Sequence, residues 1–188
     1  LTSTIILNQQ MKYIQSKSLG YGKENLVALW NANLLGNSIE PFKADLLKNP
    51  GIQNVTMSGF LPIPSSRSNS VLFKDGIKTS DFVTFQLWCI DTEYIKTLKL
   101  NIVKGRDFSS EFTTDSMAVL INQSAAKAFG WDDPIGKFIG TPEEEDSVTL
   151  YKVIGVVEDF NYESAHYPVG PLVFFLQEST GAIALRLE

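Results

Sequence analysis

The chain has 188 residues, a net charge of −5 and a pI of about 5.0. A chain of this length buries roughly 70% of its unfolded surface, so it needs no disulfide to hold a core together. The acidic balance argues against nucleic acid, which requires a basic face, and against an anionic membrane surface. Cys89 is the only cysteine, and its apolar neighbours predict a small buried residue in a strand.

The first third of the chain predicts one helix followed by a β-α-β unit. Apolar residues within 1–18 approximate one helical face, and Gly20-Tyr21-Gly22 ends that helix. Asn37-Ser38 offers an N-cap for a second helix, which Asn49-Pro50-Gly51 terminates. The unit then comprises a strand over 26–30, a helix over 39–47 and a strand over 52–60.

The middle of the chain changes character at a loop. Residues 61–70 contain two prolines followed by small polar residues, which makes this loop the best subdomain boundary. A hairpin is predicted around Asp75-Gly76, and a longer strand over 82–90. Asp91 can cap a short helix that carries Tyr94.

The last third alternates strands with one short helix. Asn122 is placed to cap a helix over 123–129, and Gly130 stands where a C′ glycine belongs. Asp159-Phe160 opens a polar, aromatic loop that closes on Pro171. The remaining predictions are strands over 118–121, 153–157, 172–176 and 183–187, a turn over 131–136 and an acidic loop over 141–147.

The residue types for nucleophilic or metal chemistry are scarce. His166 is the only histidine, and Ser164 beside it lacks the sharp nucleophile turn of hydrolases, so a loop histidine is the better interpretation. One histidine and one cysteine do not suffice for structural zinc. The acidic pairs and runs lack the spacing of a calcium loop and indicate a solvated surface.

Gly105-Arg106-Asp107-Phe108 predicts a tight turn rather than a phosphate loop. It lacks the further glycines and the Lys-Ser/Thr pair that cradle phosphates. Gly105 is expected in a conformation closed to other residues. Arg106 is expected to bind a carboxylate or carbonyls, and Phe108 to anchor the turn in the core.

With these motifs in hand, the chain resembles the periplasmic core domain of MacB/FtsX-like ABC transporter permeases, closest to their Bacteroidetes-type branch. The matching pieces occur in family order and cover nearly the whole chain. They are residues 10–21, 49–52, 90–94, 103–109, 119–122, 125–130, 134–137 and 151–171.

The resemblance implies an α+β fold with three parts. Residues 1–20 would form a stalk helix continuing from a transmembrane helix. Residues 21–60 and 177–188 would form a porter-like β-α-β subdomain, and residues 61–176 an inserted β-rich, Sabre-like subdomain. The chain starts at Leu1 and stops before the family's next helix and strand, so we expect an excised piece with an incomplete porter part.

The resemblance also implies a mechanical function and no catalysis or cofactor in this domain. ATP would be hydrolysed by a separate cytoplasmic ATPase, and membrane helices would transmit the movement to the periplasm. The work there would be efflux of peptides or drugs, lipoprotein release or hydrolase activation, in a transporter containing a second permease copy. The whole protein is expected in the inner membrane, with this domain in the periplasm. The isolated chain is expected to be a monomer.

Two sets of residues carry these expectations. Loop residues predicted to contact a periplasmic partner are Pro62, Pro64, Arg67, Tyr162, His166 and Tyr167. Motif residues predicted to be structural are Asp91, Tyr94, Gly105, Arg106, Phe108, Asn122, Gly130, Pro134, Gly136, Gly155, Asp159, Phe160 and Pro171. The alternatives are a peptide-sensing module that signals through the same helix, and a hydrolase using scattered carboxylates, for which the sequence offers no positive sign.

Overall fold

The computed structural model describes residues 19–63, 65, 67, 69–75, 83–143, 147–163 and 167–188. The predicted stalk helix over 1–18 lies outside the described residues, as do Pro64 and His166. In the described part, no helix is long and apolar enough to span a bilayer.

The described chain is a mixed α+β fold of short elements. Its strands are β1 (Leu26–Trp30), β2 (Ile52–Ser58), β3 (Asn69–Lys74), β4 (Val83–Ile90), β5 (Ile102–Gly105), β6 (Ala118–Asn122), β7 (Phe138–Pro142), β8 (Val148–Val157), β9 (Leu172–Leu176) and β10 (Ala182–Leu187). Its helices are α2 (Ile39–Leu46), α3 (Tyr94–Thr97) and α4 (Gln123–Ala128), with 3₁₀ turns η1 (Ala32–Ser38) and η2 (Thr113–Met117).

Six strands form a closed, barrel-like ring in the order β4-β3-β7-β8-β6-β9. The ring closes where β4 and β9 run parallel, with Gln86 to Ile90 paired with Leu172 to Leu176. Closure removes the free edges that an open sheet of this length would expose. β5 lies outside the ring and pairs with β8.

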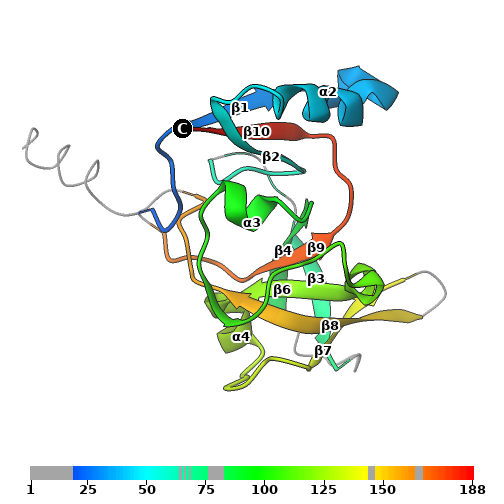
Figure 1. Ribbon diagram of the computed structural model, residues 1–188. Coiled ribbons are helices and arrows are strands. Elements are labelled where there is room, and N and C mark those ends of the chain that lie inside the picture. Colours follow the sequence, from blue (N-terminus) through cyan, green and yellow to red (C-terminus); the bar gives the residue numbers. More distant parts are fainter. Residues whose placement is uncertain are drawn as a thin grey trace, which may run out of the picture.

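A smaller sheet, β1-β10-β2, stands at one end of the ring (Figure 1). β10 is antiparallel to both neighbours, so β1 and β2 are parallel and α2 connects them on one face. Among the described residues, the strand pair Ser58 with Ile90 joins this sheet to the ring, together with the hydrogen bonds Gly59 N to Cys89 O and Asp91 N to Met57 O. Figure 1 shows α3 between the small sheet and the ring strands.

Alternating side chains along single strands divide the interior into three cores. Phe174 of β9 faces the core around α3, whereas Val173 faces the core inside the ring. On β10, Ala182 and Ala184 face α3, and Ile183 packs under α2 in the third core. The small alanines let α3 approach the sheet closely.

The structure corrects several sequence-based predictions. Ser38 precedes α2 but its side chain makes no capping hydrogen bond, because the chain arrives through η1 rather than from an extended loop. The predicted acidic loop over 141–147 starts too early, since Thr141 and Pro142 belong to β7. The strands β5 and β7 and the turn η2 were not predicted. The two strands are short, and both pair with β8.

Candidate functional site

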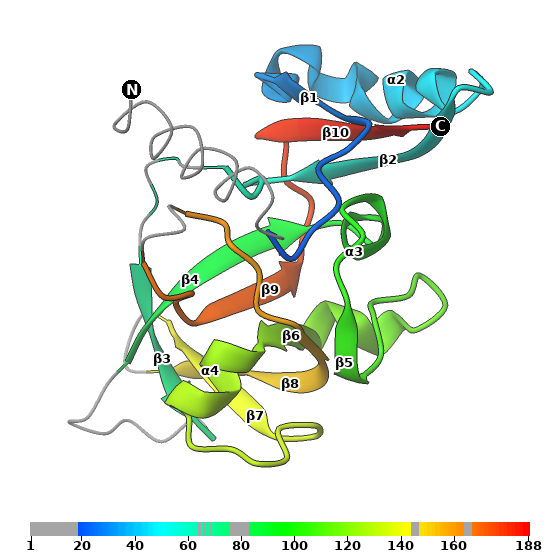
Figure 2. The ribbon, with the colours of Figure 1, turned by 90° about the vertical axis from the view of Figure 1, so that its left-hand side faces the viewer.

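Residues 19–25 form a lead-in segment that joins the N-terminal part of the chain to β1. Three distant parts of the fold hold it by backbone hydrogen bonds. Asn161 N donates to Leu19 O at 2.7 Å, Gly22 N to Leu98 O at 2.8 Å, and Leu187 N to Asn25 O at 2.9 Å. Figure 2 shows this blue segment passing beside α3 on its way to β1. The lead-in segment is therefore bonded to the loop after β8, to the end of α3 and to the end of β10.

Two glycines bring the lead-in segment into backbone contact with the core. Gly20 has a positive φ of 80°, and a Cβ built there would lie 2.8 Å from Phe160 Cα. A Cβ at Gly22 would lie 3.1 Å from the guanidinium Nη2 of Arg186. A larger residue at Gly20 would clash with the Phe160 backbone, whereas at Gly22 it would crowd the side chains of Lys99 and Arg186.

The Arg186 side chain on β10 binds the backbone of the lead-in segment. It is 2% exposed, and its guanidinium donates to the carbonyls of Gly22, Glu24 and Thr97. Burial lowers its pKa, an effect that the nearby Glu24 charge partly opposes. The sequence analysis missed this residue, although a single arginine in the apolar run Ala182–Leu187 was the available signal.

The Asp159-Phe160 motif connects the lead-in segment to α4. The Asp159 carboxylate accepts the Ser124 N–H at 3.0 Å and the Ser124 hydroxyl at 2.6 Å, at the start of α4. Phe160 is fully buried against Trp88 and Phe174. Because Asn161 bonds to Leu19, this one short loop contacts both the lead-in segment and α4.

Asn122, at the end of β6, connects the start of α4 to the start of β9. Its side-chain oxygen accepts from Ala125 N, as an N-cap does, and from Leu172 N, while its amide donates to Gly170 O. Gly130 follows the helix with a φ of 66°. The cap thus fixes α4 to β9 as well as to β6.

Asp91 ties the small sheet to α2 and α3. Its carboxylate pairs with Lys43 of α2 at 2.7 Å and accepts hydrogen bonds from Met57 N, Glu93 N and the Thr56 hydroxyl. The N-cap residue of α3 is Glu93, and no side chain caps this helix, which corrects the predicted cap by Asp91. The main partners of Asp91 are α2 and β2. Tyr94 donates from its hydroxyl to Phe60 O at 3.0 Å, and burial raises the pKa of this phenol well above its usual value.

The turn after β5 contains a bidentate ion pair. Arg106 donates from both terminal nitrogens to the carboxylate of Asp115, each at 2.7 Å, and Asp115 is 1% exposed. The guanidinium hydrogen bonds hold the pKa of Asp115 below its usual value. Burial raises the pKa of the adjacent Asp107 to about 6. Phe108 is buried beside them.

Close backbone packing explains the glycines of this region. Gly105, with a φ of 72°, stands opposite Gly155 of β8, and a Cβ on either would overlap a carbonyl oxygen of the other strand. Three other motif residues take part in backbone hydrogen bonds. In the turn before β7, the Gly136 N–H donates to the Val153 carbonyl and the Pro134 carbonyl accepts from the Lys137 N–H. Where β9 meets β4, the Pro171 carbonyl accepts from the Gln86 N–H.

Three of the residues predicted to contact a partner pack into the fold: Pro62 and Tyr162 are buried and Arg67 is partly buried. Arg67 lies 4.9 Å over the Trp88 ring and donates to the carbonyls of Leu61 and Tyr162. Tyr162 packs against Trp88 and Phe160, and Pro62 is buried beneath Tyr21, which donates to its carbonyl. Tyr167 is 69% exposed.

The described residues contain no group of three or more metal-binding side chains placed to hold an ion. Cys89 is half-buried, and burial raises the pKa of its thiol. The hydrogen bonds of Asp91, Asn122, Asp159 and Arg106 described above connect one element of the fold to another. These residues therefore hold the elements together.

The comparisons agree with this architecture. A model of the MacB-like periplasmic core domain matches residues 4–186. The chain belongs to this family: it is the periplasmic or extracellular domain of a membrane-bound ABC transporter permease. The domain is not itself catalytic and is expected to hold no cofactor, because ATP is handled elsewhere in such transporters. The Bacteroidetes-type assignment stays a prediction.

Solved structures show the same fold at low sequence identity. The periplasmic region of MacB from Actinobacillus actinomycetemcomitans is 20% identical, with a TM-score of 0.57 over 94% of this chain and 80% of that one. The extracellular domain of the noncanonic ABC-type transporter YknZ from Gram-positive bacteria is 16% identical, with a TM-score of 0.56 over 87% and 84%.

A third structure comes from Porphyromonas gingivalis. A domain of a putative permease protein is 17% identical, with a TM-score of 0.54 over 77% of this chain and 65% of that one. No curated protein sequence matches the chain.

Proposed function

We propose that this domain belongs to a permease of the mechanotransmission type, which couples cytoplasmic ATP hydrolysis to work in the periplasm. The observation that carries the proposal is the lead-in segment, bound at Leu19, Gly22 and Asn25 to three separate elements. A segment held at several points passes on a displacement instead of absorbing it. The work would be efflux of peptides or drugs, lipoprotein release or hydrolase activation.

The proposal includes the division into subdomains. A stalk over 1–20 would enter a porter-like part over 21–60 and 177–188, and a Sabre-like part over 61–176 would be inserted into it. The short connection between β2 and β4, centred on Ser58 and Ile90 within the described residues, supports this boundary. In the described part of the chain β1 pairs with β10 alone, and Trp30 on β1 is 50% exposed. This supports an incomplete porter sheet that another strand of the whole permease would complete.

A second permease copy and a cytoplasmic ATPase are the proposed partners of the whole transporter. Spin labels test the coupling there, on a Cys89→Ser background. One pair of labels, at positions 24 and 158, measures the distance between the lead-in segment and the end of β8. A second pair, with one label at position 48 of each permease copy, measures the distance between the two copies. We expect ATP to change the second distance and leave the first unchanged. A change in the first distance alone would mean that the segment slides over the domain, which would contradict coupling.

A further inference from the structure

A groove crosses the face of the domain between α4 and β5. It consists of two adjoining hollows of about 390 and 560 Å³ that share Gly130, Trp131 and Asp132. The buried side chains of Ala126, Val156 and Trp131 line it. Exposed apolar residues, Val103 and Ile135, stand at its rim. The lining of the first hollow is therefore largely apolar, whereas that of the second is mostly polar.

Lysines surround this apolar lining. Lys104 and Lys127 line the first hollow, and Lys74 and Lys137 the second, against Asp132 and Asp133. This local excess of positive charge stands out in a chain of net charge −5. Lys104 and Lys74 each donate to one backbone carbonyl, which leaves further donors on each ammonium group. Within the described ranges, none of the four lysines forms an ion pair.

Trp131 lies at the centre of the groove and lines both hollows. The residue is 8% exposed, and its indole N–H is buried with no acceptor among the described residues. A buried donor without an acceptor costs free energy, so such groups are usually satisfied by a partner. Because Trp131 lines both hollows, its indole N–H signal reports on a ligand that enters the groove.

The strand at the groove edge favours an extended ligand. β5 contributes Val103 and Lys104 to the lining, and in the described part it pairs with β8 alone. Its other edge can therefore accept backbone hydrogen bonds from an added strand. An extended chain presents side chains alternately to opposite sides, which suits an apolar floor beneath a charged rim.

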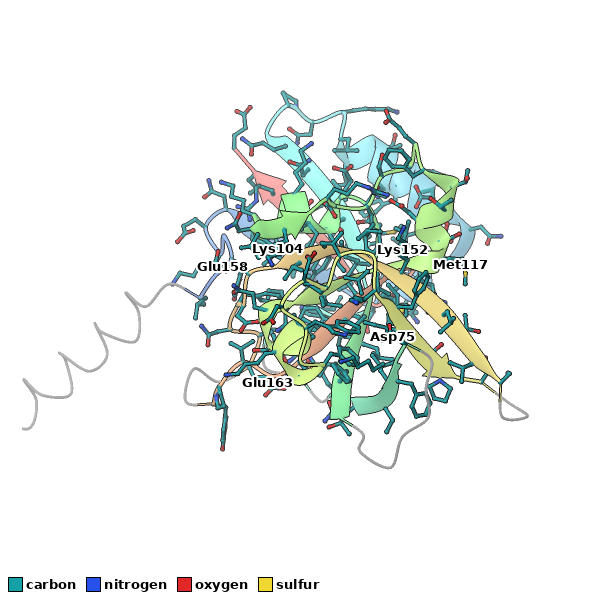
Figure 3. The ribbon with its side chains drawn as sticks, turned by 90° about the horizontal axis from the view of Figure 1, so that it is seen from below. Asp75, Lys104, Met117, Lys152, Glu158 and Glu163 are labelled. Carbon is teal, nitrogen blue, oxygen red and sulfur yellow. The ribbon has the colours of Figure 1, made fainter. Side chains whose placement is uncertain are left out.

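We propose that this groove binds an extended, acidic segment of a partner protein, with apolar side chains on the floor around Trp131 and carboxylates on the surrounding lysines. Figure 3 labels Lys104 on β5, one of the lysines that line the groove. The site goes beyond the mechanical coupling proposed above and does not depend on it, since binding to the 188-residue chain involves no ATPase.

The test uses the isotope-labelled 188-residue chain and a synthetic peptide in which Glu alternates with Leu. The three tryptophan indole N–H signals in a nitrogen–proton correlation spectrum give the readout. We expect the Trp131 signal to move on titration. Trp88, buried elsewhere, and Trp30, half-exposed on β1, should stay unchanged. A peptide that moves Trp30 and leaves Trp131 in place would overturn the proposal.

Charge-reversal variants test whether the lysines at the groove rim bind the peptide. The double variant Lys127→Glu with Lys137→Glu should weaken peptide binding by roughly tenfold or more, because both rim charges change sign. The matched control, Lys48→Glu with Lys96→Glu, makes the same change of net charge at exposed positions away from the groove. Equal weakening in both doubles would show a general charge effect and overturn the site.

Other ligands separate peptide recognition from simple anion binding. A peptide in which Gln replaces every Glu should bind roughly tenfold more weakly. Inorganic phosphate and vesicles of anionic phospholipid should move the Trp131 signal much less than the acidic peptide does. Equal responses to phosphate or vesicles would replace the proposal with an anion site or a lipid site.

Discussion

Gly20 lies against the backbone of Phe160, so closely that a Cβ on the glycine would stand 2.8 Å from Phe160 Cα. The contact joins the start of the described chain to the loop after β8. The same loop holds the N-terminal end of α4 through Asp159 and Ser124. One glycine therefore stands at the joint on which the proposed coupling depends.

Gly20→Ala is predicted to destabilise the domain by about 3 kcal/mol, because it combines left-handed backbone strain with a clash against backbone. Gly130→Ala is the matched control: its φ is also positive, at 66°, but a Cβ there meets nothing within 4 Å. The control should cost about 1 kcal/mol. Urea unfolding measures both, and equal losses would show that the Phe160 contact is unimportant.

Arg106→Gln should destabilise the domain by about 2–4 kcal/mol, because it leaves the buried Asp115 carboxylate without its charged partner. The value is reduced from that of a fully buried pair because Arg106 is itself 41% exposed. Arg106→Lys keeps the charge but cannot form both hydrogen bonds, so its loss should be intermediate. Denaturant titration of the three proteins checks this order, and a Lys variant less stable than the Gln variant would contradict it.

Asp107 should make stability fall as the pH rises from about 4 to about 6. Burial raises its folded pKa to about 6 from the ordinary 3.8, so the folded state binds the proton more tightly than the unfolded state does. The contribution is complete below the unfolded pKa and is lost as pH rises through the folded pKa. Because Asp107 is only partly buried, we expect a loss of about 1–2 kcal/mol.

Asp107→Asn removes this titration while keeping an oxygen that can accept the Phe108 N–H. The difference in unfolding free energy between variant and wild type should therefore shift in favour of the variant between pH 4 and pH 6. Subtracting the two curves cancels the other carboxylates, including Asp115, whose lowered pKa has the opposite sign. A difference independent of pH would show that Asp107 titrates normally.

The isolated 188-residue chain is predicted to be a monomer. The dimer contacts of a whole permease are expected mainly in its membrane helices, and the described residues include no membrane-spanning helix. Light scattering at micromolar concentration should return a mass near 20.9 kDa. A stable dimer would contradict the prediction. The exposed edge of β1, with Trp30, would then be the first interface to test by Trp30→Glu.

The sequence alone determined the features that depend on neighbouring residues. The apolar run before Asn122, the Asn122 cap and Gly130 specify a strand, a helix and its end within a few positions, because capping and left-handed glycine are local requirements. Gly105 was placed in a tight turn for the same reason. The ordered motifs were also enough to predict the family, which the match over residues 4–186 shows.

Only the tertiary structure decided which distant residues meet. Ring closure by β4 and β9, and the brief strands β5 and β7, depend on partners far along the chain, which no local pattern reveals. Arg67 and Tyr162 were predicted on the surface because they lie in polar loops, yet both pack on Trp88. Burial is a property of the assembled fold, and the contact of Gly20 with Phe160 exists only once that fold has formed.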